Sequence, residues 1–192
     1  MKPALPPLAE RDGISEDLAY LRANYPKREW RAHRNFGELT AFWLHVHDSL
    51  RAHGAELVRL TTGFREGQVD AGGFQRAFVP RLNQFLQHLQ GHHQIEDHAY
   101  FPKFRALDPR MVAGFDLLEA DHHHIHEALL ASARSAQALL TALPGGGDAA
   151  RAAVENYAGD ADLLLALLLR HLADEEDLVV PAMLHHGERS VG

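Results

Sequence analysis

The sequence contains no cysteine, which excludes every kind of site that depends on a thiolate. Disulfides, zinc ribbons, cysteine nucleophiles and thiolate-held iron–sulfur clusters all require that residue. Any metal bound by this chain must therefore be held by nitrogen and oxygen ligands.

Long apolar runs and an excess of positive charge are also missing. The leucine-rich run 163–169 is far too short to span a bilayer, which needs about 20 apolar residues. Lys2 and several prolines interrupt any secretory apolar stretch after Met1. A formal net charge of −7 disfavours binding to nucleic acid or to an anionic membrane. We expect a soluble, cytoplasmic protein with neither nucleic acid nor membrane as partner.

Histidine, in contrast, is abundant. The chain has 15 histidines among 192 residues, spread from His33 to His186, so they do not form an expression tag. The length fits one domain, or one domain with an appendage, and is long enough to bury a sizeable core.

Apolar residues recur at helical spacing in four long stretches, and no strand-like alternation of any length occurs. The expected helices cover residues 37–62, 73–100, 109–144 and 148–185. Their short connections predict an all-α, up-down-up-down four-helix bundle over residues 37–186.

Residues 1–36 are expected to form an N-terminal extension of this bundle. Residues 1–13 contain three prolines and predict a loose arm, and residues 14–25 carry a weak helical pattern. Trp30 and Phe36 are expected to pack the extension against the bundle.

One local pattern occurs twice. His92 is followed by Glu96 at i+4 and by Pro102 at i+10, where we expect the helix to end. His171, Glu175 and Pro181 repeat these spacings. Residues four apart lie on one helix face, so each copy presents an imidazole and a carboxylate in the same direction.

Helical phase places seven polar groups on the inner faces of the four helices. They are His47, His92, Glu96, His122, His126, His171 and Glu175. A single inward histidine is usually a hydrogen-bonded core residue. Two buried carboxylates, however, would cost several kcal/mol each without a cation, which favours a metal site over a hydrated polar core or an ion-pair network.

The set is too large for one ion but suits two ions bridged by carboxylates. Nitrogen and carboxylate ligands favour iron, manganese or zinc. His93 lies at the edge of the inner arc and His53 on its flank, so these two are the nearest candidates outside the set. Asp48, Asp97 and Asp121 could accept hydrogen bonds from ligand N–H groups, although solvated acids are the commoner case.

The combined spacing resembles that of the hemerythrin family, specifically the bacterial hemerythrin-like (HHE cation-binding) domains, over residues 37–186. The resemblance implies a non-haem di-iron centre, oxo- or hydroxo-bridged, with zinc or manganese as alternatives. Glu96 and Glu175 would bridge the irons, with one iron held further by His122, His126 and His171 and the other by His47 and His92.

The second iron would keep an open position for O2 or a similar ligand. In oxygen-carrying hemerythrins the last carboxylate is an aspartate at i+5 from its histidine. Here Glu175 stands at i+4 and Glu176 at i+5, and helical phase favours Glu175. The N-terminal extension has no counterpart in the family pattern.

Four functions remain open at this point. The first is reversible binding of O2 or NO for storage, delivery or sensing. The second is a di-iron enzyme that reduces peroxide or NO, although no general acid, nucleophile or substrate pocket is legible in the sequence. The third is a bundle with a structural metal, and the fourth is a metal-free bundle. The sequence identifies no protein partner.

Overall fold

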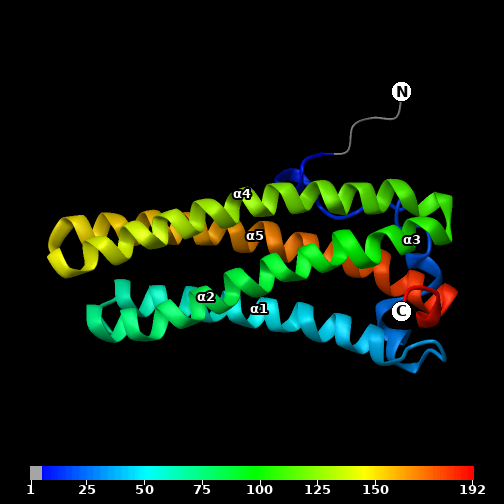
Figure 1. Cartoon of the computed structure of the whole chain (residues 1–192), viewed down its shortest axis with the longest axis horizontal. Helices are drawn as coiled ribbons and strands as arrows, with labels where there is room; N and C mark the ends of the chain where they lie inside the picture. The colour runs from blue at the N-terminus through cyan, green and yellow to red at the C-terminus, as the bar shows by residue number, and fades with distance from the viewer. Residues whose placement is uncertain (1–5) are drawn as a thin grey trace. The chain divides into compact units, whose positions relative to one another are not determined.

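The computed structural model describes residues 6–192, and every regular element within that range is helical. The α-helices are α1 (Glu38–Arg65), α2 (Ala71–Ile95), α3 (Phe101–Leu107), α4 (Val112–Ala142) and α5 (Gly147–His186) (Figure 1). A π-helical turn, Glu96–Tyr100, joins α2 to α3. Short 3₁₀ helices cover Leu8–Glu10, Arg22–Asn24, Lys27–Ala32, Pro109–Met111, Leu143–Gly145 and Glu188–Ser190. The prediction of an all-α bundle is confirmed.

Carboxylates cap two of the helix N-termini. The Asp70 side chain accepts a hydrogen bond of 2.6 Å from the backbone N–H of Gly73 in the first turn of α2. Glu188, near the end of the chain, accepts bonds from the backbone N–H groups of Gly37, Leu39 and Thr40 around the start of α1. These acceptors satisfy donors that a helix leaves without partners in its first turn.

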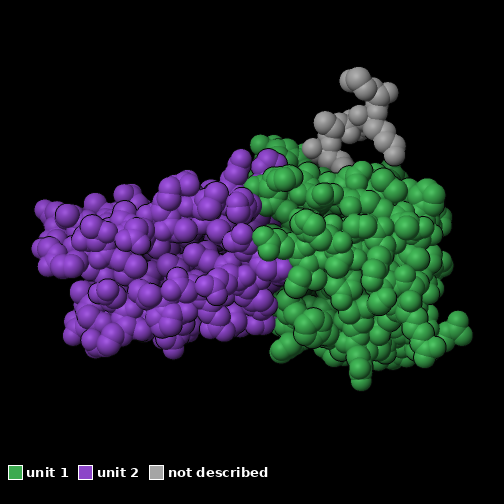
Figure 2. Space-filling view, in the orientation of Figure 1, with its two compact units in different colours: residues 1–48, 93–123, 167–192 green, residues 49–92, 124–166 purple. Residues whose placement is uncertain are grey.

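The chain divides into two compact units, which Figure 2 shows in different colours. Unit 1 comprises residues up to 48, 93–123 and 167–192, and unit 2 comprises residues 49–92 and 124–166. The predicted division into residues 1–36 and 37–186 remains a prediction. In the structure, residues 6–36 belong to unit 1 together with parts of the long helices.

Unit 2 is a four-helix bundle with an aromatic core. The ring of Phe78 in α2 stacks on Phe74 with centroids 4.7 Å apart and meets Tyr157 of α5 edge-on at 5.0 Å. Phe64, near the end of α1, stacks on Phe74 at 4.5 Å. Burial of these large rings stabilises this unit.

Unit 1 has a second core, to which the N-terminal segment, residues 6–36, contributes directly. Ile14, Leu18 and Leu21 are buried with Phe101 and Phe115 in one apolar cluster. The end of α5 is buried on nearly all sides, which a helix exposed to water on one face would not be.

The contacts of Trp30 explain part of that burial. Trp30 packs against Val180 and Leu184 of α5, and Phe36 adjoins the same cluster. The prediction that Trp30 and Phe36 attach the N-terminal segment to the helices is confirmed.

Two expectations about the N-terminal segment were wrong. Residues 14–25 form turns and the 3₁₀ helix Arg22–Asn24 rather than a helix, because tertiary packing of Leu18 and Leu21 overrides a weak local pattern. The expected arm is also not loose in its described part, since Leu8 and Arg11 are buried. Residues 1–5 of the arm lie outside the described residues.

The helix expected to run unbroken over 73–100 and to end at Pro102 instead widens into the π-turn and continues as α3. Pro102 lacks the N–H that would donate to the carbonyl four residues earlier. The N–H of Phe101 donates to the carbonyl of Glu96, five residues back. Proline thus re-phases this helix without ending it.

Within residues 6–192, none of the helices combines the length and apolarity that a membrane span requires.

Candidate metal centre

Histidine and carboxylate side chains converge in two groups that share one residue. The first group is His93, Glu96, His122 and His171, and the second is His47, His92, Glu96 and Glu175. The ligand atoms within each group lie within 4.8 Å of one another. Glu96 belongs to both groups.

The first group places imidazole nitrogens at the separation of two ligands on one ion. Nε2 of His122 lies 3.1 Å from Nε2 of His171 and 3.5 Å from Oε2 of Glu96. At metal–nitrogen distances of about 2.1 Å, two ligands at about 90° lie about 3.0 Å apart. The ring of His93 stacks on that of His122 with centroids 3.9 Å apart.

Glu175 lies between histidines of the two groups. Its Oε2 lies 3.4 Å from Nε2 of His171 and 3.5 Å from Nε2 of His47. It therefore contacts one histidine of each group. Its other oxygen, Oε1, accepts a hydrogen bond of 2.7 Å from the indole N–H of Trp43.

An outer acid adjoins Nδ1 of three of the histidines. Nδ1 of His122 lies 2.7 Å from Oδ1 of Asp97, and Nδ1 of His47 lies 3.1 Å from Oε1 of Glu176. Nδ1 of His171 lies 3.7 Å from Oδ2 of Asp121, an ion-pair distance rather than a hydrogen bond. With Nδ1 directed at an acid, Nε2 of each ring is left for the centre, as in known metal sites.

Burial and the neighbouring carboxylates shift pKa values in the centre. Burial lowers the pKa of His47, but the carboxylates of Glu175 and Glu176 outweigh burial and raise this pKa to about 9. Burial, and then the neighbouring charge of Glu175, raise the pKa of Glu96 well above its ordinary value. Both shifts favour the protonated form of the group, because a proton offsets the charge of the buried carboxylates.

The structure brings together six of the seven residues expected from the sequence. His126 is the exception: it is exposed and belongs to neither group, and His93 takes a place in the first group instead. The assignment of metal ligands itself remains a proposal.

The position of His126 follows from the period of the buried stripe on α4. Phe115, Leu118, His122, Ile125 and Leu129 are buried at alternating steps of three and four residues. This alternation has a mean period of 3.5 residues, so the position after His122 on the stripe is Ile125. A stripe drawn with a period of 3.6 residues wrongly brings His126 inward.

His93 lies on the stripe of α2 for the same reason. Leu89, His93 and Glu96 are buried at steps of four and three residues. The next buried residue is Phe101, five residues after Glu96, and that long step is the sequence signal of the π-turn.

The N-terminal segment contributes a residue that sequence reasoning missed. Arg11 is 2% exposed and donates hydrogen bonds to Asp121 of α4 and to Asp174 of α5. Nothing in the local pattern around Arg11 distinguishes it from a solvated arginine, since both of its partners lie more than 100 residues away.

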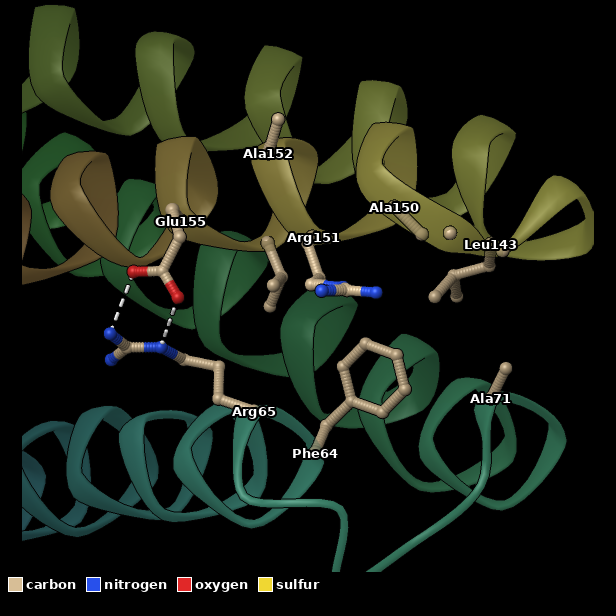
Figure 3. Close-up of a pocket in the computed structure, with 11 residues that line it drawn as sticks. Phe64, Arg65, Ala71, Leu143, Ala150, Arg151, Ala152 and Glu155 are labelled. Carbon is tan, nitrogen blue, oxygen red and sulfur yellow. Dashed lines mark hydrogen bonds and ion pairs between the residues drawn. The ribbon is translucent and has the colours of Figure 1, made fainter.

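A separate cavity of about 540 Å³ lies in unit 2 and has a different character (Figure 3). Phe64 and Leu143 contribute apolar surface, and Arg65 forms an ion pair with Glu155 at its side. No histidine occurs among the described residues that line it. The carboxylate of Glu155 in this lining is paired with Arg65.

Paired groups of imidazoles and carboxylates, held by helices, define the class: a helical cation-binding protein. The family model named Hemerythrin HHE cation binding domain matches residues 38–183, so the chain belongs to this hemerythrin family. No curated protein and no solved structure matches the chain.

Proposed function

We propose that this chain is a cytoplasmic, non-haem di-iron protein that binds O2 or NO reversibly, for storage, delivery or sensing. The observation that carries the proposal is the pair of ligand groups joined by Glu96 and approached from both sides by Glu175. Two ions sharing two carboxylates explain why so many buried polar groups meet at one place.

The residues present fit iron. All of the ligand atoms are nitrogen or oxygen, and thiolates are absent from the chain. Imidazole and carboxylate together suit iron in a redox-active site, whereas a purely structural zinc site usually has four ligands in a closed tetrahedron. A bound pair of irons would supply the electrons that reversible binding of O2 or NO requires.

The two groups differ in a way that supports binding of an external ligand. The first contains three histidines and the second contains two, His47 and His92. With Glu96 and Glu175 shared by both ions, the ion in the first group would have five protein ligands and the ion in the second four, which would leave the second a position for a small molecule. The ring of Trp43 lies 6.3 Å from that of His47 in this group, and Tyr100 packs edge-on against Trp43 at 5.0 Å, so aromatic surface adjoins this group.

The residues of the chain hold and orient the site. Trp43 fixes Glu175 by its hydrogen bond, and Asp97 and Glu176 set the orientation of His122 and His47.

The test is metal content per chain in protein purified without chelator, with visible spectra recorded after dithionite and again after air or NO. We expect about two irons per chain and near-ultraviolet bands that change reversibly. A Glu96→Gln variant should lose metal, and a variant of an exposed histidine on α4, His124→Ala, should not. Sustained consumption of peroxide or NO would indicate an enzyme, and colourless protein containing zinc would contradict the proposal.

A further inference from the structure

We propose that Arg11 in the N-terminal segment is a positioning residue for the candidate metal centre, acting through Asp121 on His171. This inference rests on the proposed metal site and extends it to a part of the chain that lies before the matched domain, which begins at residue 38.

The contacts of Arg11 are those of a buried two-sided clamp. Its Nη1 and Nη2 donate to the two carboxylate oxygens of Asp121, and its Nε donates to Oδ2 of Asp174 at 2.8 Å. The side chains of Arg11, Asp121 and Asp174 are 2%, 3% and 4% exposed. Ion pairs this deeply buried are retained only when each hydrogen-bonding position is well matched.

The two carboxylates adjoin the ligand groups in sequence and in space. Asp121 precedes His122 on α4 and lies 3.7 Å from Nδ1 of His171. Asp174 precedes Glu175 on α5. One guanidinium therefore joins the helices at the level where His122, His171 and Glu175 meet.

The orientation of His171 depends on this arrangement. Asp121 can direct Nε2 of His171 toward the centre only if its own carboxylate is held in place, and Arg11 holds both of its oxygens. Without the guanidinium, Asp121 is free to rotate, or to approach a metal ion as a competing ligand.

Backbone geometry brings Arg11 to this place. Gly13 has φ = 131°, a conformation that L-residues with a side chain rarely adopt. The chain turns there, between the buried Arg11 and Ile14, which enters the apolar cluster of unit 1. A Cβ at Gly13 would lie 3.8 Å from Oδ1 of Asp174, so space is sufficient and the dihedral angle alone requires glycine.

The direction in which metal affinity changes when Arg11 is removed distinguishes a positioning role from a purely electrostatic one. A positive charge beside the site repels a metal ion, so its removal should strengthen binding if charge were its only contribution. If Arg11 positions Asp121 and His171, its removal should weaken metal binding instead. Loss of an outer partner of a metal ligand typically weakens metal affinity by about 10- to 100-fold.

The experiment titrates metal-free protein with Co²⁺ alone, whose visible absorption reports coordination, at a temperature where circular dichroism shows every variant folded. Arg11→Met is combined with Asp174→Asn so that no carboxylate is left buried without a partner. Asp174→Asn alone, which keeps the Arg11–Asp121 contact, is the matched reference. Arg28→Met alters an exposed arginine of the same segment, whose side chain is 82% exposed, and is the surface control.

We expect wild type and Arg28→Met to bind Co²⁺ with similar affinity, and Asp174→Asn supplies the reference affinity for the double variant, since both lack the Asp174 charge. The double variant should bind at least about tenfold more weakly, with a changed absorption spectrum. The Arg11→Lys variant keeps the charge but cannot donate to both oxygens of Asp121 in a bidentate arrangement, so it should also bind Co²⁺ more weakly than wild type.

Equal or tighter binding by the double variant, relative to Asp174→Asn, would overturn the inference. If the double variant does not fold, the comparison of Arg11→Lys with wild type decides, and equal affinity would again overturn it. Absence of metal binding by wild type would instead overturn the proposed function, and the inference with it, so the two failures are distinguishable.

Discussion

The indole N–H of Trp43 donates a hydrogen bond of 2.7 Å to Oε1 of Glu175. The other oxygen of this carboxylate lies 3.5 Å from Nε2 of His47. One large aromatic side chain on α1 is thus attached directly to a candidate bridging ligand, and the centre has an intrinsic optical reporter.

Fluorescence provides the first prediction. In a Trp30→Phe variant, Trp43 is the single tryptophan. Its emission should fall strongly when iron is bound, because Trp43 is hydrogen-bonded to Glu175, a candidate metal ligand. In the complementary Trp43→Phe variant, emission comes from Trp30, which packs against Val180 and Leu184, and should change much less. Equal quenching of both variants would argue against a metal beside Trp43.

The exchange of His126 for His93 gives the second prediction. His93→Ala should lose at least one of the two ions, because His93 belongs to the first ligand group and is buried. His126→Ala should retain both ions, because its side chain is exposed. Metal content per chain after gel filtration measures the difference. Metal loss from His126→Ala alone would restore the ligand set expected from the sequence.

Most of the bundle could be predicted from the sequence, because the signals for it are local. The periodicity of apolar residues gives four long helices, and the i, i+4 pairs His92–Glu96 and His171–Glu175 share helix faces whatever the tertiary structure. Six of the seven residues expected from the sequence are brought together in the structure.

The remainder depended on small phase differences or on long-range contacts. His126 and His93 were misplaced because a period of 3.5 rather than 3.6 residues accumulates along a helix. The π-turn at Glu96–Tyr100 could have been predicted only from the five-residue step between the buried residues Glu96 and Phe101. Arg11 was missed because its partners, Asp121 and Asp174, are distant in sequence, and no local pattern encodes that contact.

The contact between Glu188 and the start of α1 gives the third prediction, which concerns stability. Glu188→Ala removes the acceptor of three backbone N–H groups and of the Thr40 hydroxyl. Loss of a helix cap costs about 1–2 kcal/mol, or roughly 2–4 °C in Tm per kcal/mol for a chain of this size. Metal content should be unchanged.

The pH dependence of this cap follows from its pKa. Burial opposes ionisation of Glu188, but the hydrogen bonds from Thr40, Gly37 and Leu39 outweigh it and lower the pKa. The contribution to stability is therefore present above the ordinary pKa of glutamate and lost as pH falls through the lowered value. The difference in Tm between wild type and Glu188→Ala should narrow under acidic conditions. A constant difference would show that the carboxylate charge is not what stabilises the helix.

Proton competition at His47 gives the fourth prediction. In the metal-free chain the pKa of His47 is raised to about 9, against burial, by Glu175 and Glu176. Stability from these ion pairs is fully present below the unfolded pKa of about 6.5 and is lost as pH rises through about 9. The metal-free protein should therefore become less stable across this window.

The metal-loaded protein should not share this loss of stability. A metal ion binds neutral imidazole, so it must displace the proton of His47, and its apparent affinity rises as that proton becomes easier to remove. Because a ligand stabilises the fold in proportion to RT ln(1 + [L]/Kd), the difference in Tm between loaded and metal-free protein should widen from pH 6.5 to 9. Calorimetry of both forms across this range measures the difference, and His124→Gln, an exposed substitution on α4, should reproduce the wild-type behaviour. A difference that stays constant or narrows would mean that the metal ion does not replace the proton on His47, and the second ligand group would then lose its histidine from α1.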